Sequence, residues 1–275
     1  WAIAAAAFAA MEIFHVPFPV ILLGAALAGV ALSRAAPGAF ATSGHDAARE
    51  VVRAPAVIDD DTPTPPHARY THGRLAAVVA ACLAIWAVGL VAALALGDVF
   101  ASMAWLFTKA ALVTFGGAYA VLPYIVQQSV EQYGWLTAAQ MIDGLALGET
   151  TPGPLIMIVA FVGFVGGWTT QAFSAGGVAA AGILGACVAP FFTFLPSFPF
   201  ILAGGPLVEA THGDARVTAP LAGITAGVVG VIGSLVVFFG YHVFWPSGMS
   251  PVGALGGLDV LALLVATAGA VALFV

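Results

Sequence analysis

A long apolar stretch that is broken twice constrains this chain more than any other feature. It runs from Trp105 to Trp168 and is interrupted at Phe115-Gly116-Gly117 and at Thr150-Thr151-Pro152-Gly153-Pro154. Helices that break at membrane depth are tolerated only where the freed backbone groups are buried in protein or line a cavity. Such breaks are also the best sequence pointer to the binding site of a transporter. The stretch therefore predicts a membrane protein with a site at its broken helices.

The balance of apolar and charged residues supports a membrane location. The chain of 275 residues is 61% hydrophobic and only 7% charged, and a soluble domain of this length would need more polar cover. The broken stretch nevertheless holds Lys109, Glu131, Asp143 and Glu149, whereas the other apolar segments hold very few charges. We therefore expect an all-α polytopic membrane protein whose charged residues gather near the breaks.

Several classes of function are excluded by what the sequence lacks. With seven Lys and Arg in all and no basic patch, it does not fit a nucleic-acid partner. Cys82 and Cys187 sit in apolar runs and are expected to be small membrane-buried hydrophobes, not a disulfide or a metal pair. No spacing of Cys, His, Asp and Glu suits zinc. Ser43-Gly44-His45 lies in a polar linker and Asp143-Gly144 lacks a companion aspartate motif. We expect no enzyme activity, no metal and no cofactor.

The segment from Ser33 to Gly73 differs in kind from the rest. It holds Asp59-Asp60-Asp61 and a run of Thr and Pro, a composition that cannot bury a core. Five of the seven Lys and Arg lie in this segment or at its edges. The positive-inside rule then predicts a cytoplasmic linker. The short polar turn from His212 to Arg216 is predicted on the same side.

The apolar segments predict a series of helices separated by Pro, Gly and polar residues. Asp98 is expected to cap the end of one of them. Trp245–Gly257 is predicted to be a loop. The expected helices are Trp1–Phe14, Pro17–Leu32, Arg74–Gly97, Ser102–Thr114, Ala118–Tyr133, Ala138–Glu149, a helix from Pro152 to about Trp168, Val178–Leu195, Phe198–Thr211, Arg216–Val243 and Leu258–Val275.

The helix Ala138–Glu149 carries a strong start signal. Thr137 and Gln140 have the spacing of a capping box, and Leu136 and Met141 that of a hydrophobic staple. We expect the following helix to begin with Thr151 as N-cap and Pro152 at its first position. Half-length helices that meet breaks in this way look like re-entrant hairpins.

The motifs in this region closely resemble the C-terminal repeat of the chromate ion transporter family. The resemblance implies two homologous halves of opposite membrane orientation, and export of chromate across the bacterial inner membrane. Alanine at position 118 stands where the family often has a third glycine. The matching motifs are Lys109, Phe115-Gly116-Gly117, Leu122-Pro123, Gly134-Trp135-Leu136-Thr137, Asp143-Gly144-Leu145-Ala146, Thr151-Pro152-Gly153-Pro154-Leu155, Pro190–Phe198 and Ala222-Gly223-Ile224.

The resemblance also divides the chain. Residues 1–32 look like the last helical hairpin of a preceding repeat, 33–73 like the linker, and 74–275 like a second repeat truncated at its C-terminus. The chain begins and ends inside apolar runs. We therefore expect the natural protein to continue on both sides, and the 275-residue piece not to transport alone. It is then one half of an inverted-repeat transporter.

The expected ligand is an oxyanion. After the first break, the backbone N–H groups of Gly116, Gly117, Ala118 and Tyr119 form a helix N-terminus, which carries partial positive charge. Lys109 lies seven residues before Gly116 and shares its helix face. A lysine within a membrane helix is a functional hypothesis by default. The alternative is that Lys109 pairs with Glu149 or Asp143 and only holds helices together.

The second break is expected to support this site. Pro152 and Pro154 have no N–H groups, so the hydroxyls of Thr150 and Thr151, beside Gly153, are the expected donors.

The acidic residues near the second break are candidates for coupling. Asp143 and Glu149 are six residues apart, about 120° around a helix, and are not an acid pair. Glu149 is a candidate proton carrier, and Asp143 is expected to cap or pair.

Some alternatives stay open at this stage. Sulfate or another oxyanion can replace chromate as the substrate, and a homo-oligomer is compatible with the sequence. A non-transporting membrane scaffold is the alternative of another class, but it gives no reason for two broken helices. Glu12 and His15 are expected at a membrane interface as polar caps, with a proton relay as the second interpretation.

Overall fold

The chain folds into helices wherever its structure is described. A computed structural model describes residues 1–35, 72–114, 118–173, 175–202, 215–246, 248 and 257–274, and no strand occurs among them. The α-helices are α1 (Ala2–Glu12), α2 (Phe18–Ala35), α4 (His72–Leu96), α5 (Asp98–Leu112), α6 (Leu122–Val126), α7 (Ala138–Glu149), α8 (Pro154–Thr169), α9 (Val178–Phe194), α11 (Ala215–Phe244) and α12 (Val260–Phe274). Short 3-10 helices η3 (Ala118–Val121) and η5 (Ala175–Gly177) and a π-helical turn, η4 (Gln127–Gln132), complete the set.

Four apolar segments are long enough to cross a membrane. They are Phe18–Ala35, Leu75–Leu96, Val178–Leu202 and Thr218–Phe244, of 18, 22, 25 and 27 residues. A helix needs about 20 apolar residues to span the hydrocarbon core. In the segment of α4, only Ala93 is buried inside the protein. Such an apolar surface is stable only against lipid or protein, so the chain is a multi-pass membrane protein.

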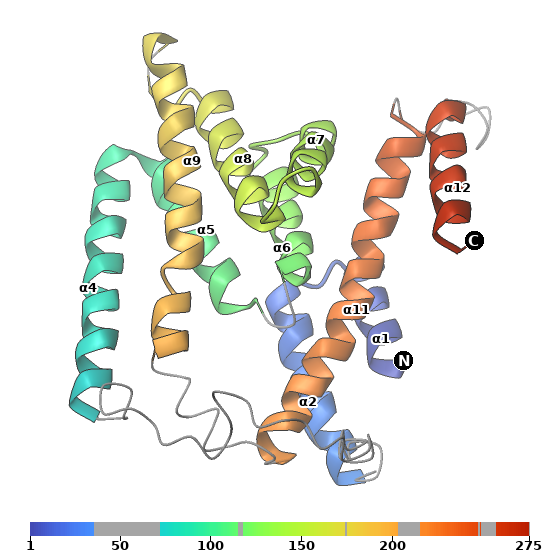
Figure 1. Ribbon diagram of the computed structural model, residues 1–275, viewed down its shortest axis with the longest axis horizontal. Coiled ribbons are helices and arrows are strands. Elements are labelled where there is room, and N and C mark those ends of the chain that lie inside the picture. The colour runs from blue at the N-terminus through green and yellow to red at the C-terminus, as the bar shows by residue number, and fades with distance from the viewer. Residues whose placement is uncertain are drawn as a thin grey trace, which may run out of the picture.

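The helices form two packed groups with a short helix between them (Figure 1). In one group α8 and α9 pack closely, α5 lies against α9, α7 lies against α8, and α4 lies outside against α5. In the other group α1 and α2 both pack on the long helix α11. The short α6 contacts both α5 and α11 and therefore links the two groups.

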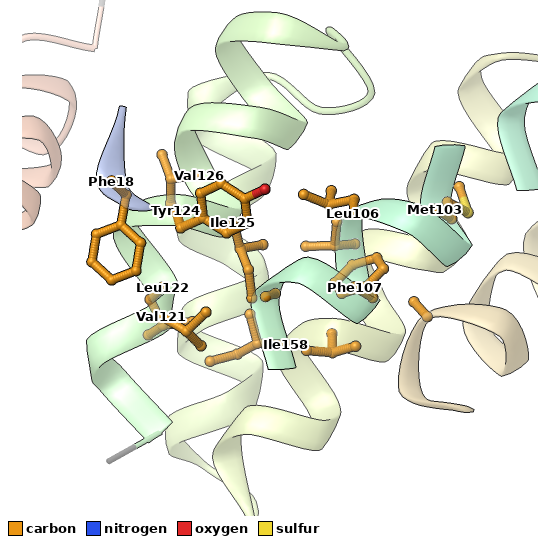
Figure 2. Close-up of a cluster of buried hydrophobic side chains, with 14 of the residues drawn as sticks. Phe18, Met103, Leu106, Phe107, Val121, Leu122, Tyr124, Ile125, Val126 and Ile158 are labelled. Atoms are coloured by element: carbon orange, nitrogen blue, oxygen red, sulfur yellow. The ribbon is translucent and has the colours of Figure 1, made fainter. Parts of the chain in front are cut away.

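A continuous apolar core lies where the groups meet (Figure 2). Phe107 of α5, Ile125 of α6 and Ile158 of α8 are fully buried in it. Phe18 of α2 is also buried, and its ring stacks on that of Tyr124 with centroids 5.8 Å apart. The N-terminal hairpin is thus anchored to the rest of the chain through α6.

Glycines let the helix backbones approach closely. A Cβ atom at Gly163 of α8 would collide with the carbonyl oxygen of Gly185 in α9, and one at Gly167 would collide with that of Ala181. A Cβ at Gly223 of α11 would lie 2.9 Å from the Cα of Gly29 in α2. Small residues at helix interfaces are typical of membrane proteins, because close packing replaces the hydrophobic effect there.

Most of the expected helices are confirmed, and the expected start of α7 is confirmed in detail. The helix spans Ala138–Glu149, and Thr137 and Gln140 form the predicted capping box. The backbone N–H of Thr137 donates to the Gln140 side chain at 2.9 Å, and the Gln140 N–H donates to the Thr137 hydroxyl at 3.2 Å. The staple residues Leu136 and Met141 are both buried.

Two expected helix starts are wrong. Helix α8 begins at Pro154 with Gly153 as its N-cap, and not at Pro152 with Thr151 as N-cap. Gly153 adopts φ 90°, a left-handed conformation that favours glycine. Helix α5 begins at Asp98, four residues before the expected Ser102, so Asp98 lies in the first turn and Gly97 is the N-cap.

Other expected elements are changed or lie outside the description. The expected helix Ala118–Tyr133 is helical but passes from 3-10 to α to π geometry. The linker beyond Ala35, the later part of the expected helix Phe198–Thr211 and most of the loop Trp245–Gly257 lie outside the described residues.

We predict that Gly163→Ala destabilises the protein by about 1 to 3 kcal/mol, the usual cost of overpacking. The added methyl group meets the backbone of α9. The matched control is Gly24→Ala in α2, where a Cβ has no atom within 4 Å. It should be neutral or slightly stabilising, because alanine favours helix over glycine. Thermal unfolding of both variants in detergent tests this. Equal unfolding temperatures would contradict the close α8–α9 contact.

Candidate functional site

Lys109 lies in the last turn of α5, directly before the first break. The carbonyl groups at a helix C-terminus carry partial negative charge and favour a cation there. Helix α5 ends at Leu112, and Val113 donates its N–H back to the Lys109 carbonyl at 3.1 Å. The sequence therefore places one cationic side chain at the end of a helix that stops inside an apolar region.

The side chain of Lys109 lines a crevice of about 680 Å³ between α4, α5 and residues 195–200. The crevice is largely apolar. Trp86 of α4 donates its indole N–H to the Thr108 hydroxyl at 2.9 Å, and this hydrogen bond fixes α4 against α5 beside the lysine. The remaining described lining residues are Leu75, Val79, Cys82, Leu83, Trp105, Leu112, Leu195, Pro196, Pro199 and Phe200.

No carboxylate faces Lys109 among the described residues. Neither Glu149 nor Asp143 lines the crevice, and no ion pair joins either of them to Lys109 in the part of the chain that the structure describes. Both carboxylates are exposed on α7. The structure therefore does not contain the ion pair that the alternative interpretation of Lys109 required.

The hydroxyls at the second break are already engaged. Thr150 donates to the Leu147 carbonyl at 3.0 Å, and Thr151 donates to the carbonyls of Leu147 at 3.2 Å and Gly148 at 3.0 Å. Both side chains thus satisfy carbonyls in the last turn of α7, which have no partner within the helix. To serve an anion, each hydroxyl would have to leave its carbonyl.

Part of the predicted anion cradle lies outside the described residues. This holds for Gly116 and Gly117 at the first break. The backbone of Ala118 and Tyr119 is described and begins the 3-10 helix η3. Of the remaining predicted residues, Gly153 caps α8. In the described part of the chain, none of the cavities found is lined both by Lys109 and by residues of the second break.

Sequence reasoning missed a second, more polar cavity. It is about 350 Å³ in volume and lies between the end of α1, the π-helical turn η4 and the end of α11. The sequence indicates Glu12 and His15 as polar residues at a membrane interface, but it does not indicate which residues contact them. Ser234 and His242 come from α11, more than 200 residues away, and no local pattern connects residues so far apart.

The fold and the crevice define a multi-pass membrane protein with a lysine-bearing break, an arrangement typical of transporters. Residues 101–275 match the family model described as chromate transporter. This match covers more than half of the chain, so the chain belongs to the chromate transporter family. The resemblance found in the sequence is confirmed. The expectation that the chain is not an enzyme is confirmed with it, since the family is one of transporters.

Three curated relatives are similar over part of their length. The chain is 39% identical over 170 residues to a chromate transport protein of Pseudomonas aeruginosa, covering 59% of this chain and 37% of that protein. It is 31% identical over 131 residues to a chromate transport protein of Cupriavidus metallidurans, covering 48% and 29%. It is 28% identical over 138 residues to a probable chromate transport protein of Synechococcus elongatus, covering 50% and 32%.

The chain thus spans about a third of the length of the curated relatives it matches. No solved structure matches it.

We predict that Lys109 and Glu149 are energetically independent. Because the two side chains share neither an ion pair nor a cavity, the effects of Lys109→Ala and Glu149→Gln on unfolding should add within about 0.5 kcal/mol. Unfolding of both single variants and the double variant in mixed micelles measures this. A coupling well above that value would restore the structural interpretation of Lys109.

The capping box supplies a positive control for the same measurement. Thr137→Ala and Gln140→Ala remove the Thr137 hydroxyl and the Gln140 side-chain oxygen, which are hydrogen-bonded at 3.2 Å. Contacting residues couple by about 0.5 to 3 kcal/mol. The method is therefore valid if this pair shows coupling and the test pair does not.

Proposed function

We propose that this chain is part of a transporter that moves chromate across a bacterial inner membrane, in the direction of efflux. The family match over residues 101–275 carries this proposal. It is supported by the relatives from Pseudomonas aeruginosa and Cupriavidus metallidurans, which are named chromate transport proteins. Chromate is a tetrahedral dianion, and sulfate has the same shape and charge. Sulfate and other oxyanions are therefore the competing substrates to test.

The substrate site that we propose centres on Lys109. An ammonium group in a largely apolar crevice, with no carboxylate beside it among the described residues, favours the approach of an anion. The backbone N–H groups that follow the first break, from Gly116 to Tyr119, would supply direction, and the lysine most of the charge. Thr150, Thr151 and Gly153 at the second break would support the same ion.

Coupling and architecture form the remaining parts of the proposal. Glu149 and Asp143 are proposed as coupling carboxylates, since both are exposed on α7 next to the second break. Residues 1–32 would belong to a preceding repeat, 33–73 to a cytoplasmic linker and 74–275 to a second, inverted repeat with re-entrant hairpins. A homo-oligomer is also part of this proposal.

We predict that Lys109→Ala weakens chromate binding about 10- to 100-fold, the usual value of a hydrogen bond to a charged group. Lys109→Arg should lose less, because the charge remains while its shape changes. Isothermal titration with chromate, repeated in competition with sulfate, measures both. Arg34→Gln at the end of α2 is the control, since it removes an exposed cation outside the crevice.

A second variant tests the backbone part of the site. Gly116→Val should abolish transport through crowding of the backbone while leaving membrane insertion intact. Unchanged chromate affinity in Lys109→Ala would remove Lys109 from the proposed site. Tighter binding of sulfate than of chromate would change the proposed substrate.

We predict that the linker lies in the cytoplasm. A cysteine at Ser43 should resist an impermeant thiol reagent added to intact cells and react after the cells are opened. The native Cys82 and the exposed Cys187 must first be replaced by alanine, because both are free thiols. Strong labelling of Ser43→Cys in intact cells would reverse the proposed orientation.

A further inference from the structure

The polar cavity between α1, η4 and α11 is chemically unlike the crevice at Lys109. Its volume is about 350 Å³, enough for several water molecules. Five of its lining residues can titrate, and they come from three separate parts of the chain. They are Glu12, His15, Glu131, Tyr241 and His242.

His242 is fixed in one tautomer by its own helix. Its Nδ1 lies 2.9 Å from the backbone carbonyl oxygen of Phe238. A carbonyl oxygen only accepts hydrogen bonds, so Nδ1 carries the hydrogen and Nε2 is left as the basic nitrogen. The side chain lines the cavity and is therefore oriented to take a proton there.

Two groups near His242 are of a kind that attracts cations. His242 lies in the last turn of α11, beside the carbonyl groups of the helix C-terminus. The ring centroids of Phe238 and His242 lie 4.5 Å apart, with the two rings tilted by 43°.

Glu12 supplies the opposite charge. The hydroxyl of Ser234, which is only 6% exposed, donates to the Glu12 carboxylate at 2.5 Å. A hydrogen bond donated to a carboxylate favours its ionised form. Ser234 and His242 both belong to α11 and are eight residues apart. The same helix therefore carries the hydroxyl that donates to Glu12 and the imidazole that can take a proton.

The cavity also contains an unsatisfied acceptor and a strained turn. The side-chain oxygen of Gln127 is buried and has no hydrogen-bond partner among the described residues. It lines the cavity and can accept a hydrogen bond from water or from a protonated group there. His15 has φ 50°, which is uncommon for a residue other than glycine. Strained residues of this kind cluster at functional sites.

Other charged groups near these helices do not reach the cavity. Helices α2, α7 and α12 contact α11. The charged residues on or beside these helices do not line the cavity; they are Arg34, Asp143, Glu149 and Asp259. The charges that His242 meets among the described residues are therefore those of Glu12 and Glu131, with His15 as a second titratable base.

We propose that this cavity is a proton-binding site, in which Nε2 of His242 takes a proton from cavity water and Glu12 is the counter-charge held by Ser234. The neutral imidazole becomes an imidazolium, and no other bond changes. The inference rests on the proposed transport function for its role, which is to set the pH dependence of oxyanion transport. Helix α11 packs on α1, α2 and α6, so a charge at its end acts on the contacts between the two helix groups.

The direct test is a histidine titration. The protein is labelled with ¹⁵N-histidine in lipid nanodiscs, and the Nε2 resonances are followed from about pH 5 to about pH 8, the range in which imidazole titrates. His242→Gln should remove one titrating resonance and so assign it. In Glu12→Gln, the midpoint of that resonance should change because the counter-charge is removed, and an unchanged midpoint would exclude Glu12 from the site.

The functional test places the same substitutions in the full-length transporter, reconstituted in liposomes. Initial rates of chromate uptake are measured across this pH range for the wild type, His242→Gln and Glu12→Gln. His242→Gln should flatten the pH profile, and Glu12→Gln should move it in the same direction as the resonance. Asp98→Asn, which removes an exposed carboxylate at the start of α5 outside the cavity, is the control and should keep the wild-type profile.

The possible results distinguish failure of the proton-site proposal from failure of the proposed transport function. A His242 resonance that does not titrate overturns the proposal even if the variant fails to fold. The same conclusion follows if His242→Gln keeps the wild-type pH profile. A full-length wild-type transporter that takes up no chromate at any pH overturns the proposed function, while the titration still decides whether the cavity binds a proton.

Discussion

Close contact between helix backbones at glycine is the interaction on which the rest of this structure depends. Lipid is as apolar as a leucine side chain, so helices in a membrane gain little by hiding apolar surface from it. Gly163 and Gly185 bring α8 against α9, and Gly29 and Gly223 bring α2 against α11. These contacts build the two helix groups. The Lys109 crevice belongs to one group, and the polar cavity lies where α11 meets α1 and η4.

The two cavities differ in the charged groups that line them. The crevice presents a single ammonium group among apolar side chains, whereas the polar cavity gathers carboxylates, imidazoles and a buried amide. An isolated charge in an apolar setting is costly and gains most from an opposite charge that arrives with the substrate. A mixed acid and base cluster can instead change its own charge by exchanging protons with water.

Local signals predicted most of the secondary structure. What they missed has two causes: competing local hydrogen bonds at the second break, and contacts between distant residues in the polar cavity. The capping box at Thr137 specified the start of α7 because its two partners are three residues apart. At the second break, the sequence predicted that α8 begins at Pro152 with Thr151 as its N-cap. The hydroxyls of Thr150 and Thr151 return to carbonyls of α7, so the chain turns at Gly153 and the later proline begins α8. The pairing of Glu12 with Ser234 had no local signal at all.

Helix α4 has a consequence for how the sequence is free to vary. Only Ala93 is buried in its membrane-crossing segment, which contacts chiefly α5, where Trp86 donates to Thr108. Most of its surface therefore faces lipid acyl chains, which are disordered and do not require a particular side-chain shape. Selection on such a surface acts on average hydropathy and length, since any apolar side chain serves equally well against disordered acyl chains. Among related sequences, we expect many different apolar residues along α4 but few polar ones. Trp86 should vary less, because it donates a hydrogen bond to Thr108.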